Sequence, residues 1–230
     1  MELGEPVPGW TPKAPPPYTP MTGRYVTLVP LLPEHAEPLW EAAGDDVWTY
    51  LSYGPFASAA EYREWVVANA AGTDPLFYAV LVGGEPRGVI SILRIDAANG
   101  SGEIGHVWYA PSIQRSRATT EVAYLVGRRL FDECGYRRYE WKCNALNAAS
   151  RAAAERFGFA YEGTFRRHMV AKGRNRDTAW FAMTDAEWPA IRAEFERWLD
   201  PANFDADGRQ RSRLNASSAS TNAWSGSSRS

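Results

Sequence analysis

The segment from residue 103 to residue 120 carries the side chains best suited to chemistry in this 230-residue chain. A strand-like run ends at Ala110 and Pro111, and a short loop then leads into a predicted helix. The start of a helix exposes unpaired backbone N–H groups and the positive end of the helix dipole, which together bind phosphates. Two arginines and several hydroxyls add donors there, in the series Gln114, Arg115, Ser116, Arg117, Ala118, Thr119 and Thr120. The pattern indicates a pyrophosphate site, and a solvated, capped helix end is the alternative interpretation.

Hydrophobic periodicity predicts the elements that position this segment. Three strand-like runs, 76–82, 87–95 and 103–109, are separated by turn sequences and should form an antiparallel meander. A long helix over 117–134 follows, and Gly135 is placed to end it. Further strands are predicted at 24–32, 137–143, 160–170 and 178–183, and further helices at 33–43, 61–71, 148–157 and 187–199. This order predicts an α/β or α+β protein with a mixed sheet.

The two ends of the chain differ from its middle. Residues 1–22 contain seven prolines, which favour an extended tail or strap over a packed element. Residues 205–230 are rich in serine and poor in aliphatic side chains, so we expect a disordered tail. Residues 23–204 remain as a single domain with enough length for one core.

Composition excludes several classes of protein. With 25 basic and 27 acidic side chains, the net charge of −2 argues against a dedicated binder of nucleic acids or anionic membranes. No apolar run approaches the roughly 20 residues that cross a bilayer, and the N-terminus lacks a signal-peptide pattern, so we expect a cytoplasmic protein. The chain has two cysteines and three histidines without ligand spacing, so we expect neither a disulfide framework nor a metal site.

Residues 103–124 and 141–163 resemble the GCN5-related N-acetyltransferases (GNAT), particularly the branch of the ribosomal-protein N-terminal acetyltransferases. The most specific parts are the Gln114-led loop, the Asn147-x-x-Ser150 spacing and the sequence Phe157-Gly158-Phe159. The resemblance covers about residues 23–200 and implies a mixed, mostly antiparallel sheet flanked by helices on both faces. It also implies transfer of an acetyl group from acetyl-CoA to a primary amine, by direct attack in a ternary complex and without a metal.

The resemblance assigns cofactor contacts to backbone groups. The family loop reads Gln/Arg-x-x-Gly-x-Gly/Ala and its amides hold the coenzyme A pyrophosphate, whereas this chain has Arg117 and Thr119 at the two small positions. Every residue except proline has a backbone amide whatever its side chain, so the loop can still bind the pyrophosphate if the side chain of Arg117 turns outward. The family also places the thioester carbonyl against a backbone N–H of the preceding strand, here among Val107, Trp108 and Tyr109, and the cofactor near Asn147 and Ser150.

Two catalytic roles follow from the same resemblance. Glu103 lies eleven positions before Gln114, where several family members carry the general base, although an isolated glutamate there could simply face water. His106 is the competing base, on the opposite face of the strand by strict alternation, and water is a third possibility.

Ser150 is the candidate partner of the thiol sulfur, because the tyrosine that many members use is replaced by Ala154. Asn147 and Ser150 could instead only cap a helix. The missing tyrosine and Arg117 support an alternative function, a catalytically weak or inactive CoA-binding sensor or scaffold.

The acceptor side is predicted between the first two helices. The family places part of its acceptor groove there, and Asp45, Trp48 and Tyr50 could hold an ammonium by charge and cation–π attraction. The same aromatic residues could equally pack on the core beneath solvated carboxylates. A basic stretch over 166–176 either faces an acidic acceptor or is solvated. The acceptor, a peptide or a small-molecule amine, and the state of the protein, a monomer or a homodimer, stay open.

Overall fold

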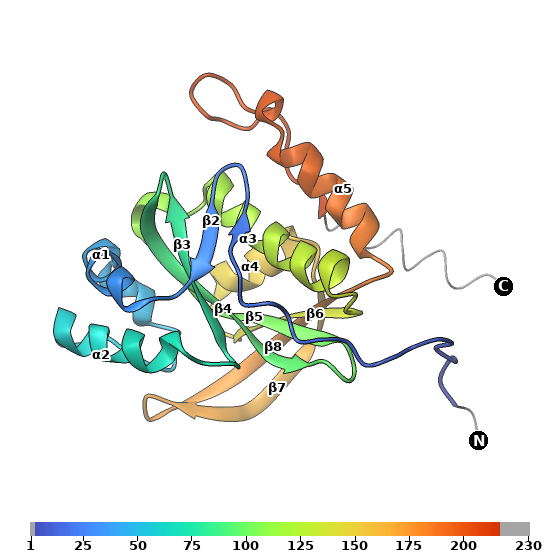
Figure 1. Ribbon diagram of the computed structural model, residues 1–230, viewed down its shortest axis with the longest axis horizontal. Coiled ribbons are helices and arrows are strands. Elements are labelled where there is room, and N and C mark those ends of the chain that lie inside the picture. The colour runs from blue at the N-terminus through green and yellow to red at the C-terminus, as the bar shows by residue number, and fades with distance from the viewer. Residues whose placement is uncertain (1–2, 217–230) are drawn as a thin grey trace.

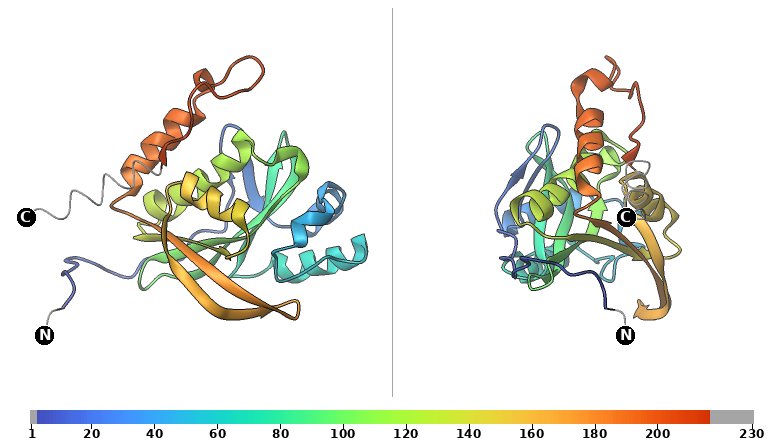
Figure 2. Two further views of the ribbon diagram at one scale, coloured as in Figure 1. Left: turned by 180° about the vertical axis from the view of Figure 1, so that it is seen from behind. Right: turned by 90° about the vertical axis from the view of Figure 1, so that its right-hand side faces the viewer.

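A computed structural model describes residues 3–216, which form one eight-stranded sheet with helices on both faces (Figures 1 and 2). The strands are β1 (Met21–Thr22), β2 (Thr27–Pro30), β3 (Leu76–Val82), β4 (Glu85–Asp96), β5 (Ser101–Tyr109), β6 (Arg138–Asn144), β7 (Ala160–Ala171) and β8 (Arg174–Thr184). Their order is β1-β2-β3-β4-β5-β6-β8-β7, and β5 with β6 is the parallel pair among antiparallel neighbours. The predicted mixed, mostly antiparallel sheet is confirmed.

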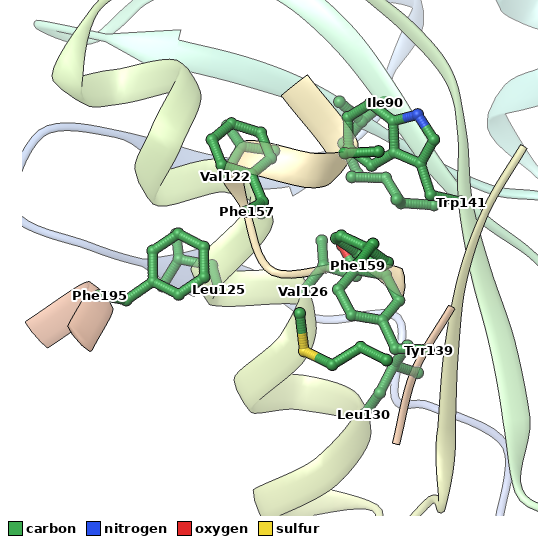
Figure 3. Close-up of a cluster of buried hydrophobic side chains, with 14 of the residues drawn as sticks. Ile90, Val122, Leu125, Val126, Leu130, Tyr139, Trp141, Phe157, Phe159 and Phe195 are labelled. Carbon is green, nitrogen blue, oxygen red and sulfur yellow. The ribbon is translucent and has the colours of Figure 1, made fainter. Parts of the chain in front are cut away.

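The helices divide between two hydrophobic cores. The α-helices are α1 (Ala36–Ala42), α2 (Ala59–Ala70), α3 (Arg117–Arg128), α4 (Ala148–Arg156) and α5 (Trp188–Leu199), and the short helical turns are η1 (Pro33–His35), η2 (Asp45–Trp48), η3 (Pro111–Ile113), η4 (Arg129–Glu133) and η5 (Pro201–Asn203). The first core joins α3, α4 and α5 to one face of the sheet (Figure 3). The second core joins α1 and α2 to the other face, through Leu39, Tyr62, Phe77 and Val89. Within residues 3–216 no helix has the length and apolarity to span a bilayer.

The helix predicted over 117–134 is present, with one irregularity. Val122, Leu125 and Val126 lie on its buried face, as the 3.6-residue period requires. The last turn, η4, is π-helical, and Gly135 then ends the helix with a φ of 65°. The π-helical turn also contains Arg129, which contacts a segment outside the helix.

The contact outside the helix is with the proline-rich N-terminal segment. Arg129 of η4 is buried, and its guanidinium donates to the carbonyls of Pro17, Thr19 and Pro20. Prolines lack an N–H but keep a carbonyl, so an extended proline-rich chain presents acceptors that suit an arginine. The segment from there to Met21, which is buried in β1, packs along the domain as a strap.

A second anchor holds the chain just after this strap. The buried carboxylate of Glu121 in α3 accepts the backbone N–H groups of Arg24, Tyr25 and Val26, at 2.8, 2.6 and 3.0 Å. A Cβ atom at position 23 would overlap that carboxylate, so Gly23 is required by close approach. Three backbone donors thus compensate one buried charge.

The C-terminal segment differs from the expected disorder over residues 205–216. Ser212 exchanges hydrogen bonds with Asn203 and receives one from Arg197, while Leu214 and Ala216 are buried in the first core. The segment is ordered by polar groups that the domain presents, which composition alone does not reveal. Residues 217–230 lie outside the described residues.

Candidate active site

The sheet opens between β5 and β6. The parallel pairing runs from Ser101 opposite Arg138 to Ile104 opposite Trp141 and then stops, although both strands continue. In the part of the chain that the structure describes, the edge of β5 from Gly105 to Tyr109 therefore has ladder partners on the β4 side alone. Unpaired backbone groups on such an edge are available to a ligand.

A β-bulge lies at the opening. The pairing of β4 with β5 shifts register between Val89 and Ser91, and His106 has a φ of 53°. Because of this extra residue, the imidazole of His106 lies beside the rings of Phe77 and Tyr53, with centroids 4.9 and 5.6 Å away. The prediction that His106 and Glu103 face opposite sides of the sheet is wrong, because strict alternation holds only in a strand without a bulge.

The environment of His106 keeps its imidazole neutral. Burial lowers its pKa to about 4, and the nearby cations Arg94 and Arg176 act in the same direction. The imidazole is therefore uncharged at neutral pH and can accept a proton only weakly.

Glu103 is buried and held between two cations. Its carboxylate is 2.7 Å from Nη1 of Arg94 and 3.0 Å from Nζ of Lys142. Lys142 also contacts Glu140 at 2.7 Å and lies 3.7 Å from the ring centroid of Trp180. The structure thus replaces the picture of a glutamate facing water with a carboxylate fixed inside an ion-pair network.

The start of α3 is the segment for which the sequence predicts a pyrophosphate site. Arg115 takes the left-handed conformation, with a φ of 57°, and Ser116 caps the helix by accepting the N–H of Thr119. The first-turn amides of Arg117 and Ala118 have no partner within the helix. The hydroxyls of Thr119 and Thr120 both donate to the carbonyl of Ser116, so these two residues offer no free hydroxyl proton to a phosphate.

The side chain of Arg117 turns away from the first-turn amides. Its guanidinium lies 4.7 Å from the ring centroids of both Tyr25 and Phe204. Arg117 stands where the family has a glycine, but its backbone does not need a positive φ, because the positive φ of this loop falls at Arg115. The backbone amides at the start of α3 are therefore left uncovered.

Residues 26–160, more than half of the chain, match the family described as the Acetyltransferase (GNAT) domain. The chain belongs to the GNAT acetyltransferase family. A solved GCN5-related N-acetyltransferase from Brucella melitensis is 45% identical, covers 90% of this chain and 97% of its own, and superposes with a TM-score of 0.88. A probable GNAT acetyltransferase from Chromobacterium violaceum is 38% identical, covers 83% and 98%, and has a TM-score of 0.77.

A curated relative supports the ribosomal-protein branch of the GNAT family. It is the Bacillus subtilis protein named "Putative ribosomal N-acetyltransferase YdaF", 26% identical over 180 residues, which are 74% of this chain and 97% of the relative. This GNAT chain therefore spans nearly the whole length of a protein in that branch. Acetyl transfer is the activity of the family to which it belongs.

In this GNAT domain, Asn147 and Ser150 open α4 beside the gap. The side chain of Asn147 accepts the N–H of Ser150, so the capping role is present. The hydroxyl of Ser150 also accepts a hydrogen bond from Nε1 of Trp141 at 3.0 Å. Its oxygen is thus fixed in place, and capping of the helix does not use the hydroxyl proton.

The three predicted acceptor residues separate in the GNAT structure. Asp45 is exposed at the start of η2, whereas Trp48 is buried in the second core, with its ring centroid 5.5 Å from that of Trp108. The hydroxyl of Tyr50 donates to the carbonyl of Leu146 at 3.3 Å. Both Trp48 and Trp108 therefore belong to the core, and the backbone is the part of Trp108 that borders the gap.

The tip of the β7–β8 hairpin reaches the same loop. Nζ of Lys172 donates to the carbonyl of Trp48 at 2.6 Å, so the hairpin, which projects beyond the rest of the sheet, is tied to η2 (Figure 2). Together with the Tyr50 bond, two hydrogen bonds cross from the α1–α2 connection to the β6–β8 half of the sheet. Glu103 and His106 lie on the face of the sheet that carries the second core, and we call the opened part of this face the groove.

Sequence reasoning did not single out Arg94 and Lys142. Arg94 directly follows the apolar part of β4, which is a signal that could have found it, whereas Lys142 alternates with Arg138 and Glu140 in β6, a pattern that is typical of a solvated face. Within residues 3–216 there is no cluster of three or more His, Cys, Asp or Glu that could hold a metal ion.

Proposed function

We propose that this GNAT protein transfers an acetyl group from acetyl-CoA to a primary amine, by direct attack of the amine in a ternary complex. The observation that carries the proposal is that the open edge of β5 and the first turn of α3, each with unpaired backbone groups, lie at the two ends of one short loop. A coenzyme A thioester has amides along its arm and a pyrophosphate near its end, so it can pair with both of these segments. When bound, it supplies an activated acetyl carbonyl.

The residues present fit such a ligand. The amides of Arg117 and Ala118 are free at a helix N-terminus, and Ala118 adds no bulk there. The side chain of Gln114 donates to the carbonyl of Tyr109 at 3.0 Å, which fixes the loop between the strand edge and the helix. Both segments are thus held in position before a ligand binds.

Glu103 is the group that we assign as proton acceptor for the amine. It lies on the groove face of β5, because its neighbour Ile104 faces the first core. The three cations Arg94, Lys142 and Arg176 near it disfavour the ammonium form of the acceptor and so favour the neutral amine that attacks. The nitrogen then bonds to the acetyl carbon, the carbon–sulfur bond breaks, and the amine proton passes to Glu103.

Ser150 is placed to meet the leaving sulfur. Its oxygen accepts from Trp141 and its hydroxyl also hydrogen-bonds the Cys143 side chain, so its proton can turn from Cys143 to donate a hydrogen bond to a thiolate. This arrangement stabilises the departing group without a tyrosine at position 154.

The test is thiol release from acetyl-CoA in the presence of an amine panel, with acetyl-CoA affinity measured separately by calorimetry. We expect Glu103→Gln to lower turnover by about 10²- to 10⁴-fold, the range of general-base contributions, while acetyl-CoA still binds. Glu64→Gln, at an exposed position of α2, is the matched control and should behave as the wild type. Binding without thiol release for any amine would instead support the CoA-binding sensor or scaffold.

A further inference from the structure

Arg176 of β8 has no carboxylate partner among the ion pairs of residues 3–216, and it lies on the face of the sheet that carries Lys142. It lies two residues before Thr178 in the sequence. Thr178 pairs with Asn144, the last residue of β6, so Arg176 lies past the end of that strand and borders the opened part of the sheet. Alternation from Trp180, which pairs with Lys142, places Arg176 on the groove face with that lysine. Its Nε is buried and unpaired, and its Nη1 makes a weak hydrogen bond to Sδ of Met169 at 3.8 Å.

The charge of Arg176 is not balanced by its surroundings. The nearby groups that favour its charged form are the thiol of Cys143 and the carboxylate of Glu103, and Glu103 is already paired with Arg94 and Lys142. Burial lowers the pKa of Arg176, and the proximity of Arg94 adds to this effect. Within residues 3–216 no ion pair to Arg176 is formed, and a half-buried guanidinium in that condition is costly unless an anion joins it.

Other unpaired groups on this side of the sheet are also donors. Nε1 of Trp180, on the same face of β8, is buried without a partner, and so is the hydroxyl of Tyr53, whose ring stacks on His106. An indole N–H and a guanidinium donate hydrogen bonds and cannot accept them. The ligand that fits this set must therefore bring acceptor oxygens, and a planar carboxylate can take two guanidinium donors at once.

We propose that the acceptor amine carries a carboxylate close to it, which Arg176 binds while the amine faces Glu103. This inference rests on the proposed acetyltransferase function and names the class of its substrate. Two kinds of acceptor have a carboxylate close to a primary amine: a free amino acid, and a peptide whose first residue is aspartate or glutamate. Polyamines and aminoglycosides, which are cationic, meet three like charges in this groove and are disfavoured.

The decisive measurement compares acceptors that carry carboxylates with the same acceptors in which the carboxylates are replaced by amides. Acetyl-CoA-dependent thiol release is measured with glutamate against glutamine amide, and with a peptide beginning with glutamate against the same peptide beginning with glutamine. We expect kcat/KM to favour the carboxylate in at least one pair by roughly 10- to 100-fold, the range for a hydrogen bond to a charged group. The pair that shows the preference tells whether the acceptor is a free amino acid or a peptide. Equal rates within both pairs would overturn the inference while leaving the acetyltransferase function in place.

Two variants assign the preference to Arg176. Arg176→Gln should abolish it by raising KM for the carboxylate-bearing acceptor to that of its neutral partner. Arg174→Gln, at an exposed position of the same strand, should retain it. If Arg176→Gln keeps the preference, the carboxylate is bound elsewhere and the inference fails.

A binding measurement separates the inference from the enzymatic proposal. Calorimetric titration of the wild type with glutamate and with the glutamate peptide, in the presence of coenzyme A, requires no reaction. We expect binding that is lost in Arg176→Gln and kept in Arg174→Gln. The midpoint of thermal unfolding of Arg176→Gln should be at least as high as that of the wild type, because an unpaired charge is removed; a large loss of stability would show that Arg176 is structural.

Discussion

Removal of Lys142 tests how much the ion-pair network of Glu103, Lys142 and Glu140 contributes to the free energy of unfolding. Its ammonium bridges two carboxylates, those of Glu103 and Glu140, and its side chain is 5% exposed against 4% for Glu103. Replacement by methionine keeps the length of the side chain and deletes the charge. The variant Lys142→Met therefore leaves two carboxylates with one cation fewer in a site that water barely reaches.

The size of the effect depends on the cations that are left. Deleting one partner of a buried ion pair costs about 3–5 kcal/mol. Glu103 keeps Arg94 and Glu140 keeps Arg138, so we expect the lower end of that range, about 3 kcal/mol. For a domain of this size, that loss lowers the midpoint of thermal unfolding by about 6–12 °C.

The loss should also depend on pH. Burial raises the pKa of Glu140, but hydrogen bonds from Lys142 and Arg138 outweigh it and hold that pKa below its usual value. A lowered carboxyl pKa contributes stability above the unfolded value near 4.3, and the contribution disappears as the pH falls through the folded value. The deficit of Lys142→Met should therefore be complete at pH 7 and shrink as the pH approaches 4.

Urea unfolding at pH 7 and at lower pH measures these quantities. Lys13→Met is the matched control, because the ammonium of Lys13 lies over the ring of Trp10 and makes no ion pair within the described residues. The double variant Glu103→Gln/Lys142→Met should recover part of the loss, since it removes the stranded charge. A Lys142→Met protein within about 0.5 kcal/mol of the wild type, the usual span of a surface substitution, would refute the reasoning.

Three further predictions concern single positions. Ser150→Ala should lower kcat more than it weakens acetyl-CoA binding, measured by steady-state kinetics and calorimetry; unchanged kcat would remove Ser150 from the mechanism. Between pH 7 and pH 5 the wild type should lose about 2 kcal/mol more stability than His106→Asn. The reason is that the imidazole has a pKa of about 4 in the folded protein and about 6.5 in the unfolded chain, so protonation favours the unfolded chain as the pH falls below 6.5. Parallel curves of stability against pH would contradict this. Glu121→Gln should cost about 2–3 kcal/mol in urea unfolding, since a neutral amide accepts three backbone donors less strongly than a carboxylate, and Glu64→Gln should cost nothing measurable.

The order of helices and strands was predictable because most elements, though not α2, have a clear period. The apolar residues of α3 recur at helical spacing, and the run ending at Tyr109 alternates as a strand until the bulge. Periodicity could not locate the bulge, because one extra residue at His106 leaves the composition of the strand unchanged and reverses the face on which the later residues lie.

Side-chain partners were beyond the reach of the sequence for a different reason. Glu103, Arg94 and Lys142 come from three strands, and the register that joins them depends on the whole sheet. The order of residues 205–216 was missed because their few aliphatic side chains gave no signal, whereas the groups that hold them, such as Asn203 and Arg197, belong to the domain.

The two hydrogen bonds that the α1–α2 connection makes with the β6–β8 half of the sheet have a mechanical consequence. The Lys172–Trp48 and Tyr50–Leu146 bonds tie that connection at two points to segments that are 124 and 96 residues away in the sequence. A movement that separates the two halves must break at least one of these bonds, so weakening either bond should make the separation easier.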